Sequence, residues 1–181
     1  MIDEQLRRKI LPIKLFVTDA DGVLTDGTMY YTESGDEFKK FNTRDGGGLM
    51  LLQFAGIKTA IVTSEETKMV ENRAKKLQVD ALIQGSKNKL QALSQLLNQF
   101  SLQNEEVAYI GDDINDIPII REVGFSIAVA DATREIIKIA DYIIQAPGGK
   151  GAVREAAELI LDVQGKYDSA LQKYLESRNT L

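Results

Sequence analysis

Short apolar runs alternate with helical patterns along most of this chain, and that alternation restricts the possible folds more than any other feature. Six runs have the length and composition of buried strands: 13–18, 59–63, 81–84, 107–111, 125–129 and 142–145. The clearest helical patterns are 66–77, 87–100 and 151–163. A repeated order of strand, helix and strand favours a parallel sheet with helices on both faces. We therefore predict an α/β fold with a doubly wound, mostly parallel sheet.

The chain reads as one domain with a short tail. Its length of 181 residues suits a single domain, and no linker or internal repeat divides it. We predict one domain over 1–166 and a C-terminal tail over 167–181. The tail is polar with sparse apolar positions, which fits a loosely docked helix or a frayed end equally well. In the helical pattern 87–100, four leucines are expected to face the core: Leu90, Leu93, Leu96 and Leu97.

The segment 28–41 interrupts the alternation. It follows the first strand, where a crossover helix is expected, and reads as two strands around a turn at 33–36. We predict a β-hairpin inserted beside the carboxyl end of the first strand. Its aromatic residues exceed what an isolated hairpin shelters: Tyr30, Tyr31, Phe38 and Phe41. The hairpin is therefore expected to pack on another surface, such as a second subunit.

Composition excludes several kinds of chemistry. The chain contains no cysteine and no histidine, so disulfides, thiolate or imidazole metal sites and Ser-His-Asp catalysis are absent. Any metal must accept oxygen ligands, which favours Mg²⁺. A net charge of −5 without a basic block disfavours nucleic acid and membrane surfaces as partners. No apolar run approaches the ~20 residues that span a bilayer, and the polar start indicates a cytoplasmic protein.

Two carboxylates, Asp19 and Asp21, directly follow the first predicted strand. In an open α/β sheet, ligands bind beyond the carboxyl ends of the strands. Two aspartates this close repel each other unless a cation lies between them. The pair therefore indicates a cation site, although two aspartates can also serve as turn or cap residues.

A second acidic cluster follows the strand 107–111. Asp112 comes first after the strand, and with Asp19 it makes an oxygen-rich site suited to Mg²⁺. Asp116 precedes Pro118 and suits a helix N-cap, while Asp113 suits a solvated position. The roles of Asp113 and Asp116 stay open at this point.

Three further residues suit the binding of a phosphoryl group. Thr63 and Ser64 follow the strand 59–63, where a hydroxyl and free backbone N–H groups at a helix entrance bind phosphate oxygens. Either residue could instead be a plain N-cap of the next helix. Lys89 lies near a helix start, where a positive charge is unfavourable unless an anion is close. Lys87 is its competitor for this role, and a solvated lysine is the alternative for both.

Taken in order, these residues resemble the haloacid-dehalogenase superfamily, whose phosphohydrolases use an aspartate nucleophile. The order is Asp-x-Asp after the first strand, Thr after the next, Lys before a helix and Gly-Asp-Asp-x-x-Asp after a later strand. Further segments resemble a small capless family within it, the 3-deoxy-D-manno-octulosonate 8-phosphate phosphatases: 19–27, 41–46, 84–85, 88–89 and 148–155. The resemblance runs from about Lys14 to about Lys166, nearly the whole chain.

The resemblance implies a Rossmann-like sheet with an inserted hairpin and no cap domain. It also implies a Mg²⁺-dependent sugar phosphatase of lipopolysaccharide biosynthesis, which hydrolyses 3-deoxy-D-manno-octulosonate 8-phosphate through an aspartyl phosphate. Members of the family are homotetramers, in which hairpins meet near the centre and a neighbouring subunit helps to close each site.

The resemblance assigns roles to matching positions. Asp19 is the nucleophile and Asp21 the general acid and base. The residues expected to hold Mg²⁺ are Asp19, Asp21 through its backbone carbonyl, and Asp112. The residues expected to hold the phosphoryl group are Thr63, Ser64 and Lys89. The positions expected to contact the substrate are Asn42, Thr43, Arg44, Asp45, Gly46, Glu65 and Arg73, with Arg73 meeting the sugar carboxylate.

One position departs from the family pattern. The octulosonate phosphatases usually carry a basic residue after the phosphate-binding segment, whereas this chain has Glu65. Sister enzymes that act on nine-carbon ulosonic acid 9-phosphates typically have Glu there, followed by Arg and Lys, like Arg73 and Lys76. The eight-carbon substrate is our first prediction, a sialic-acid-like nine-carbon substrate is the alternative, and the role of Lys76 stays open.

Two other functional classes fit part of the pattern. A signalling receiver domain also combines an acidic Mg²⁺ pocket, a phosphorylated Asp, a Thr and a Lys on a doubly wound sheet. Its acidic pair and its phosphorylated Asp lie on different strands, whereas Asp19 and Asp21 lie on one. A catalytically inactive structural subunit is the third possibility, and the complete set of site residues argues against it. Phosphate release from sugar phosphates separates all three.

Overall fold

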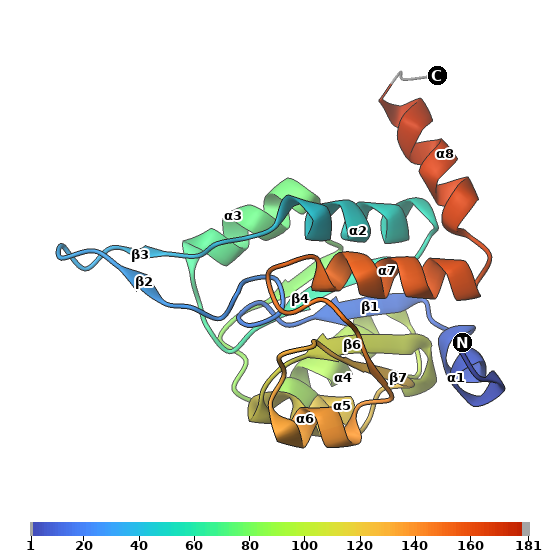
Figure 1. The fold of residues 1–181 in the computed structure, drawn as a ribbon, viewed down its shortest axis with the longest axis horizontal. Coiled ribbons are helices and arrows are strands. Elements are labelled where there is room, and N and C mark those ends of the chain that lie inside the picture. Colours follow the sequence, from blue (N-terminus) through green and yellow to red (C-terminus); the bar gives the residue numbers. More distant parts are fainter. Residues whose placement is uncertain (1, 179–181) are drawn as a thin grey trace.

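A computed structural model describes residues 2–178 and contains one six-stranded sheet (Figure 1). The strand order is β5-β4-β1-β6-β7-β8, and every neighbouring pair is parallel. The bounds are β1 (Leu15–Thr18), β4 (Lys58–Val62), β5 (Ala81–Ile83), β6 (Val107–Gly111), β7 (Phe125–Ala128) and β8 (Tyr142–Ile143). The predicted α/β class is confirmed, and each of the six apolar runs overlaps one strand of the sheet.

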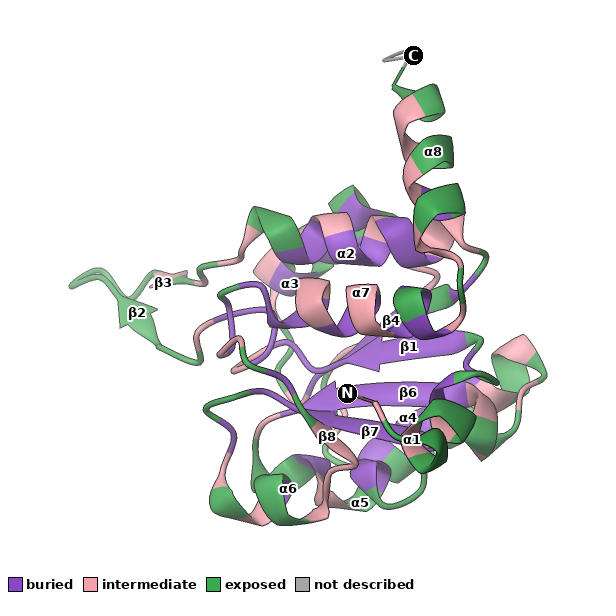
Figure 2. Ribbon diagram, turned by 45° about the vertical axis from the view of Figure 1, so that its right-hand side comes forward, coloured by how far each residue is buried: buried purple, intermediate pink, exposed green. Residues whose placement is uncertain are grey.

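The central strand β1 explains why these runs are continuously apolar. It pairs with β4 on one side and with β6 on the other, so that Leu15 lies opposite both Lys58 and Val107. All four residues of β1 are buried. A parallel strand covered by helices on both faces has no solvent face, and its sequence therefore does not alternate. Figure 2 shows the strands β1, β6 and β7 as the buried centre of the molecule.

Helices cover the sheet on both sides (Figure 1). One layer contains α2 (Thr43–Phe54), α3 (Lys68–Leu77) and α7 (Ala152–Val163). The other contains α4 (Lys89–Phe100), α5 (Ile117–Ile120) and α6 (Arg134–Ile139), while α1 (Glu4–Ile10) lies where β1 begins. Among residues 2–178, no helix is both long and apolar enough to cross a bilayer.

The missing crossover helix is α2, which follows the hairpin. The sequence analysis did not predict α2, because three consecutive glycines, Gly46 to Gly48, lower its helix propensity. Close packing explains at least one of them. A Cβ atom on Gly48 would lie 2.8 Å from the Cα atom of Arg154 in α7. The glycine therefore lets α2 and α7 approach each other.

One prediction for the helix at 87–100 is wrong. Leu93 and Leu96 are buried as expected and Leu97 is half-buried, but Leu90 is 38% exposed. The inward face of α4 contains Lys89, Ala92, Leu93 and Leu96. Leu90 follows Lys89 by one residue and therefore points to the side of the helix. Lys89, and not Leu90, is therefore the core-facing residue in the first turn of α4.

The predicted hairpin is present and projects from the end of the sheet where β1, β4 and β6 finish (Figures 1 and 2). Its strands are β2 (Tyr30–Tyr31) and β3 (Glu37–Phe38), and Tyr30 pairs with Phe38. Tyr31 is 67% exposed and Phe38 is 56% exposed. Phe41 differs from these residues, because it is half-buried at the hairpin base and packs against the core. Within one chain, the tip aromatics therefore remain uncovered.

The segment after Lys166 forms α8 (Tyr167–Ser177), which leans on α2 (Figure 1). Ala170 is buried, and the ring of Tyr174 meets the edge of Phe54 at a centroid distance of 6.0 Å. The Nζ atom of Lys173 donates to the backbone carbonyl of Phe54 at 3.2 Å. Residues 179–181 of the predicted tail lie outside the described residues.

Candidate active site

The carboxyl ends of β1, β4 and β6 meet at the end of the sheet that carries the hairpin (Figure 1). From β1 the chain continues toward β4 and β5 and then returns to β6, so the sheet order reverses between β1 and β6. A cavity of about 220 Å³ opens there, with walls from the segments 19–22, 27–29, 63–65 and 112–115. This is the position at which open α/β sheets bind ligands.

Asp19, the first residue after β1, is buried and held at both carboxylate oxygens. Its Oδ1 atom accepts the backbone N–H of Ala20 at 2.7 Å. Its Oδ2 atom lies 2.9 Å from the Nζ atom of Lys89. Only 1% of the Lys89 side chain and 6% of the Asp19 side chain are exposed. The carboxylate therefore has a defined orientation beside a buried ammonium group.

Lys89 is held from its other side by Asp116 and Tyr109. Its Nζ atom donates to Oδ1 of Asp116 and lies 3.1 Å from the hydroxyl of Tyr109, which itself donates to Asp116 at 2.6 Å. The Oδ2 atom of Asp116 accepts the backbone N–H of Asp112 at 2.9 Å. The position of Asp116 before Pro118 suggests a side-chain cap of α5, but the Asp116 side chain makes no such hydrogen bond. It supports Lys89 and the backbone that carries Asp112.

Asp112 lies against the turn that follows Asp21. A Cβ atom on Gly22 would lie 2.0 Å from Oδ2 of Asp112, and Gly22 also has a φ of +84°. Only glycine suits both conditions. The Oδ1 atom of Asp112 is buried and has no hydrogen-bond partner among the described residues. The site therefore contains an acceptor oxygen that requires a ligand.

Three carboxylates could hold a cation here. Oxygen atoms of Asp19, Asp112 and Asp116 all lie within 4.8 Å of one another. Asp19 and Asp112 line the cavity, whereas Asp116 does not, so Asp19 and Asp112 are the better ligands. An all-oxygen donor set of this kind suits Mg²⁺.

Burial dominates the electrostatics of the site. It raises the pKa of Asp19, although the charge of Lys89 opposes this shift. Burial, together with the negative charges of Asp19 and Asp116, raises the pKa of Asp112 to about 8. Burial lowers the pKa of Lys89, but the charges of Asp19 and Asp116 outweigh it, so the net shift is upward. Lys89 therefore stays cationic, and the carboxyl groups require further positive charge to ionise fully.

Asp21 borders the cavity and pairs with a residue that the sequence analysis missed. Its Oδ1 atom lies 2.6 Å from the Nζ atom of Lys39, which comes from the hairpin. Its Oδ2 atom is buried and has no partner among the described residues. The two oxygens of this carboxylate therefore have different surroundings.

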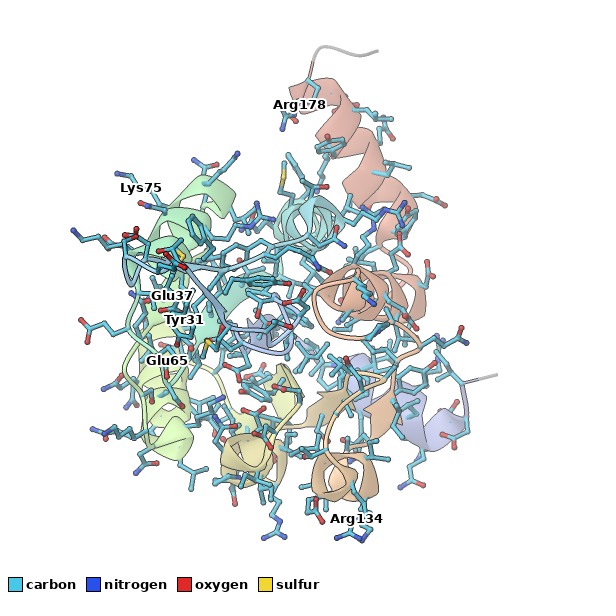
Figure 3. The ribbon with its side chains drawn as sticks, turned by 60° about the vertical axis from the view of Figure 1, so that its left-hand side comes forward. Tyr31, Glu37, Glu65, Lys75, Arg134 and Arg178 are labelled. Atoms are coloured by element: carbon cyan, nitrogen blue, oxygen red, sulfur yellow. The ribbon has the colours of Figure 1, made fainter. Side chains whose placement is uncertain are left out.

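The residues after β4 form another wall of the cavity. Thr63 is buried, and its Oγ1 atom accepts the backbone N–H of Glu65 at 3.2 Å. Neither Thr63 nor Ser64 caps the next helix, because α3 begins at Lys68 with Thr67 as its N-cap. Glu65 is exposed and lies on the same side of the molecule as the hairpin residues Tyr31 and Glu37 (Figure 3). The side chain of Asn115 reaches Ser64 at 3.4 Å and completes this wall.

The other predicted substrate contacts lie away from the cavity. Arg73 donates to the backbone carbonyl of Asn42 at 2.8 Å and stacks on Phe41. Asp45 is fully buried and accepts the backbone N–H of Arg154 at the start of α7. Within one chain, the structure brings none of the following to the cavity wall: Asn42, Thr43, Arg44, Asp45, Gly46 and Arg73.

Sequence reasoning missed three residues of the site, Lys39, Tyr109 and Asn115. Tyr109 lies inside an apolar strand, and its sequence context resembles that of any core aromatic. Lys39 is one of two adjacent lysines, and no local pattern separates it from the exposed Lys40. The motif Gly-Asp-Asp-x-x-Asp indicated Asp116, but the sequence did not indicate that Asp116 pairs with Lys89.

Comparison with known proteins gives consistent matches. A family profile for haloacid dehalogenase-like hydrolases matches residues 81–155. The 3-deoxy-D-manno-octulosonate 8-phosphate phosphatase KdsC of Escherichia coli is 46% identical over 158 residues, which cover 87% of this chain and 84% of that protein.

Solved structures share the same fold. The 3-deoxy-D-manno-octulosonate 8-phosphate phosphatase of Moraxella catarrhalis, in complex with a magnesium ion, a phosphate ion and a KDO molecule, matches with a TM-score of 0.91. It is 40% identical, and the match covers 96% of this chain and 99% of that chain. The cobalt-bound deoxy-D-mannose-octulosonate 8-phosphate phosphatase of Haemophilus influenzae matches with a TM-score of 0.85 and 38% identity, covering 88% of this chain and 93% of that chain. The similarity therefore extends over most of the chain in both sequence and fold.

Proposed function

Because this chain belongs to the 3-deoxy-D-manno-octulosonate 8-phosphate phosphatase family of the haloacid dehalogenase-like hydrolases, we propose that it hydrolyses that sugar phosphate to the free sugar acid and inorganic phosphate. The observation that carries this proposal is the buried pair of Asp19 and Lys89, near an oxygen of Asp112 that has no partner in the described part of the chain. A nucleophilic carboxylate, an ammonium group and a metal-ligand oxygen are the groups that phosphoryl transfer requires.

In the first half-reaction, Asp19 attacks the substrate. A carboxylate oxygen forms a bond to phosphorus, and the bond between phosphorus and the sugar oxygen breaks. Asp21 gives its proton to that sugar oxygen, so the leaving group departs as an alcohol. The products of this step are the free sugar and an aspartyl phosphate on Asp19.

In the second half-reaction, water hydrolyses the aspartyl phosphate. Asp21, now a carboxylate, takes a proton from the water as the water oxygen bonds to phosphorus. The bond between phosphorus and the Asp19 oxygen breaks. Inorganic phosphate leaves, and both aspartates return to their starting states.

A Mg²⁺ ion fits the residues of this site. Asp112 would supply a buried oxygen that has no partner among the residues described, Asp19 would supply a second carboxylate, and the backbone carbonyl of Asp21 is our proposed third ligand. When bound, Mg²⁺ would offset negative charge on the transferring phosphoryl group. Burial and the neighbouring carboxylates raise the pKa of Asp112 to about 8, and a bound cation would favour its ionised form.

The phosphoryl group needs donors as well as a cation. We assign this role to Lys89, to Thr63 and to Ser64, which follows β4 at the cavity wall. Thr63 and Ser64 line the cavity, and Lys89 lies behind it against Asp19, so the three residues suit separate oxygens of one phosphoryl group. Their positions are set by the ends of β4 and α4 and not by flexible loops alone.

The eight-carbon substrate has priority over the nine-carbon alternative, because the named relatives act on the octulosonate. We propose that Glu65 contacts the sugar, and its exposed position at the border of the cavity supports this. Asp45 is fully buried within its own chain, and for Asn42, Thr43, Arg44, Gly46 and Arg73 a substrate role requires that a neighbouring subunit complete the site. We propose a homotetramer on these grounds and on the uncovered hairpin aromatics, and a cytoplasmic location remains a prediction from the sequence.

The test of this function is phosphate release by the purified protein. Eight- and nine-carbon ulosonic acid phosphates, together with simple sugar phosphates, are compared with and without Mg²⁺. We expect the highest kcat/KM for the octulosonate and loss of activity when Mg²⁺ is chelated. A stable phosphorylated protein without turnover would support a receiver domain, and no reaction with any phosphate would support an inactive subunit.

A further inference from the structure

Lys39 is the only residue of the hairpin strands and turn, 30–39, whose side chain is nearly inaccessible while it contacts the candidate active site. Only 2% of the Lys39 side chain is exposed, and its Nζ atom lies 2.6 Å from Oδ1 of Asp21. The adjacent Lys40 offers a direct contrast. Its side chain is 59% exposed, and its Nζ atom pairs with Asp26 at 2.6 Å, away from Asp21.

The two oxygens of Asp21 are therefore unequal. Oδ1 is held by the ammonium group of Lys39 and more weakly by the hydroxyl of Thr25 at 3.5 Å, whereas Oδ2 is buried and has no partner within residues 2–178. An unpaired buried acceptor is costly unless a ligand satisfies it. Since Asp21 borders the cavity, the substrate or the attacking water is the natural partner for Oδ2.

On this basis, and resting on the proposed function of Asp21, we propose that Lys39 is a positioning residue for the general acid and base. By holding Oδ1, Lys39 leaves Oδ2 as the oxygen that gives a proton to the leaving sugar oxygen and later takes one from water. A carboxylate free to rotate would present either oxygen in several orientations. A displacement of about 1 Å in a reacting group is enough to cost about 100-fold in rate.

The alternative is that Lys39 merely anchors the hairpin. Its Nζ atom also lies 3.6 Å from Oε1 of Glu37, so the same side chain contributes to hairpin structure. The two roles differ in their dependence on the leaving group. An alkyl sugar oxygen needs a proton as it leaves, whereas p-nitrophenolate leaves without one. If Lys39 positions the proton donor, its loss slows hydrolysis of the sugar phosphate more than hydrolysis of p-nitrophenyl phosphate. If Lys39 only anchors the hairpin, its loss slows hydrolysis of both substrates.

The experiment compares kcat/KM for the octulosonate 8-phosphate and for p-nitrophenyl phosphate, in Mg²⁺ at one pH. Lys39→Met is expected to lower the value for the sugar phosphate by about 10- to 100-fold and the value for p-nitrophenyl phosphate by less than about threefold. Lys39→Arg keeps a cationic donor and is expected to recover at least about tenfold of the loss. Lys40→Met is the matched control, with both values within about threefold of wild type.

A double-mutant cycle tests the coupling to Asp21 directly. In an Asp21→Asn background, Lys39→Met is expected to have little further effect on the sugar phosphate, because the positioned group is already lost. Light scattering confirms that each variant keeps the assembly size of wild type. If Lys39→Met does not fold, Lys39→Gln takes its place in both comparisons.

The proposal is overturned if Lys39→Met lowers kcat/KM equally on the two substrates or keeps wild-type activity. It is also overturned if the effects of Lys39→Met and Asp21→Asn on kcat/KM are additive. Failure of the proposed function has a different signature. If wild type hydrolyses another alkyl sugar phosphate but not the octulosonate, the substrate assignment is wrong and Lys39 is tested on that other substrate. If wild type hydrolyses no phosphate ester at all, both the function and the role of Lys39 are overturned.

Discussion

In the proposed mechanism, Asp19 must be ionised to attack phosphorus, yet its burial raises its pKa and favours the protonated form. Lys89 partly resolves this conflict, because its ammonium group lies 2.9 Å from Oδ2 of Asp19. Lys89 in turn depends on Asp116 and Tyr109, which hold it from the other side. The proposed nucleophile therefore belongs to a buried polar network with Lys89, Asp116 and Tyr109. Removal of any one of these groups leaves another one without its partner.

We predict that Asp19→Asn abolishes turnover while the protein stays folded. The side chain keeps its shape, but an amide cannot form the acyl phosphate. Phosphate release is expected to fall by more than about 10³-fold. Asp162→Asn, at an exposed position on α7, is the control and keeps wild-type activity. Equal activity of wild type and Asp19→Asn would refute the mechanism.

A second prediction concerns Mg²⁺ and pH. In the metal-free protein, burial raises the pKa of Asp112 from the ordinary value of 3.8 to about 8. The folded state thus binds the Asp112 proton more tightly than the unfolded state. The stability that comes from this tighter proton binding is lost as pH rises toward about 8. Mg²⁺ binds the ionised form, so its stabilising effect should grow over the same range.

Thermal unfolding with Mg²⁺ and with a chelator measures this effect. We expect the Mg²⁺-induced rise in Tm to be larger at about pH 9 than at about pH 6. Asp112→Asn should show little Mg²⁺ effect at either pH. Equal increments in wild type at both pH values would contradict the assignment of Asp112 as a ligand.

A third prediction concerns Glu65, whose side chain borders the cavity. A carboxylate accepts hydrogen bonds from sugar hydroxyls or an acylamino N–H, whereas a guanidinium pairs with the sugar's own carboxylate. Glu65→Arg should therefore lower relative kcat/KM on nine-carbon substrates and keep or raise it on the eight-carbon one. Competition assays with both sugar phosphates measure the ratio. An unchanged or opposite ratio would show that Glu65 does not contact the sugar.

At the scale of the element, Asp45 links two helices of one layer. It belongs to α2, and its Oδ1 atom accepts the backbone N–H of Arg154, in the first turn of α7, at 3.1 Å. Burial raises its pKa, although the backbone amides at the start of α7 oppose that shift. This arrangement satisfies a helix N-terminus that would otherwise be buried without a partner.

We expect Asp45→Ala to reduce stability and not substrate affinity. Loss of the buried acceptor should lower the free energy of unfolding by about 1–3 kcal/mol, as measured by denaturant titration. KM should stay within about twofold of wild type. Asp168→Ala, an exposed residue in the first turn of α8, is the control. A large rise in KM with unchanged stability would instead favour the substrate contact that the sequence suggested for Asp45.

The elements that the sequence predicted best are those with purely local signals. Each strand of the sheet follows from an apolar run, and Asp19 and Asp112 follow from their positions after two of those runs. By contrast, α2 was missed because its glycines lie against α3 and α7, which are far away in the sequence. The sequence analysis missed Lys39, Tyr109 and the pairing of Asp116 with Lys89 for the same reason, because only long-range contacts distinguish these residues from others.

At the scale of the whole molecule, the hairpin is the feature that one chain does not explain. Its strands have two residues each, and a ribbon of that size is marginal in water without packing. Tyr30 and Phe38 are cross-strand partners, and both are exposed. The hairpin also carries Lys39 to Asp21, so packing of the hairpin and the geometry of the site are connected.

We therefore predict that Tyr30→Ser together with Phe38→Ser disrupts the proposed tetramer and lowers activity. The two substitutions remove apolar surface that a neighbouring hairpin would cover, and a weakened assembly would leave the site open. Light scattering at micromolar concentration should report a tetramer for wild type and smaller species for this variant, with reduced phosphate release. Leu11→Ser together with Ile143→Ser, which removes exposed apolar side chains far from the hairpin, should keep both properties. A fully active wild-type monomer would contradict the prediction, because the hairpin aromatics would then need no partner subunit.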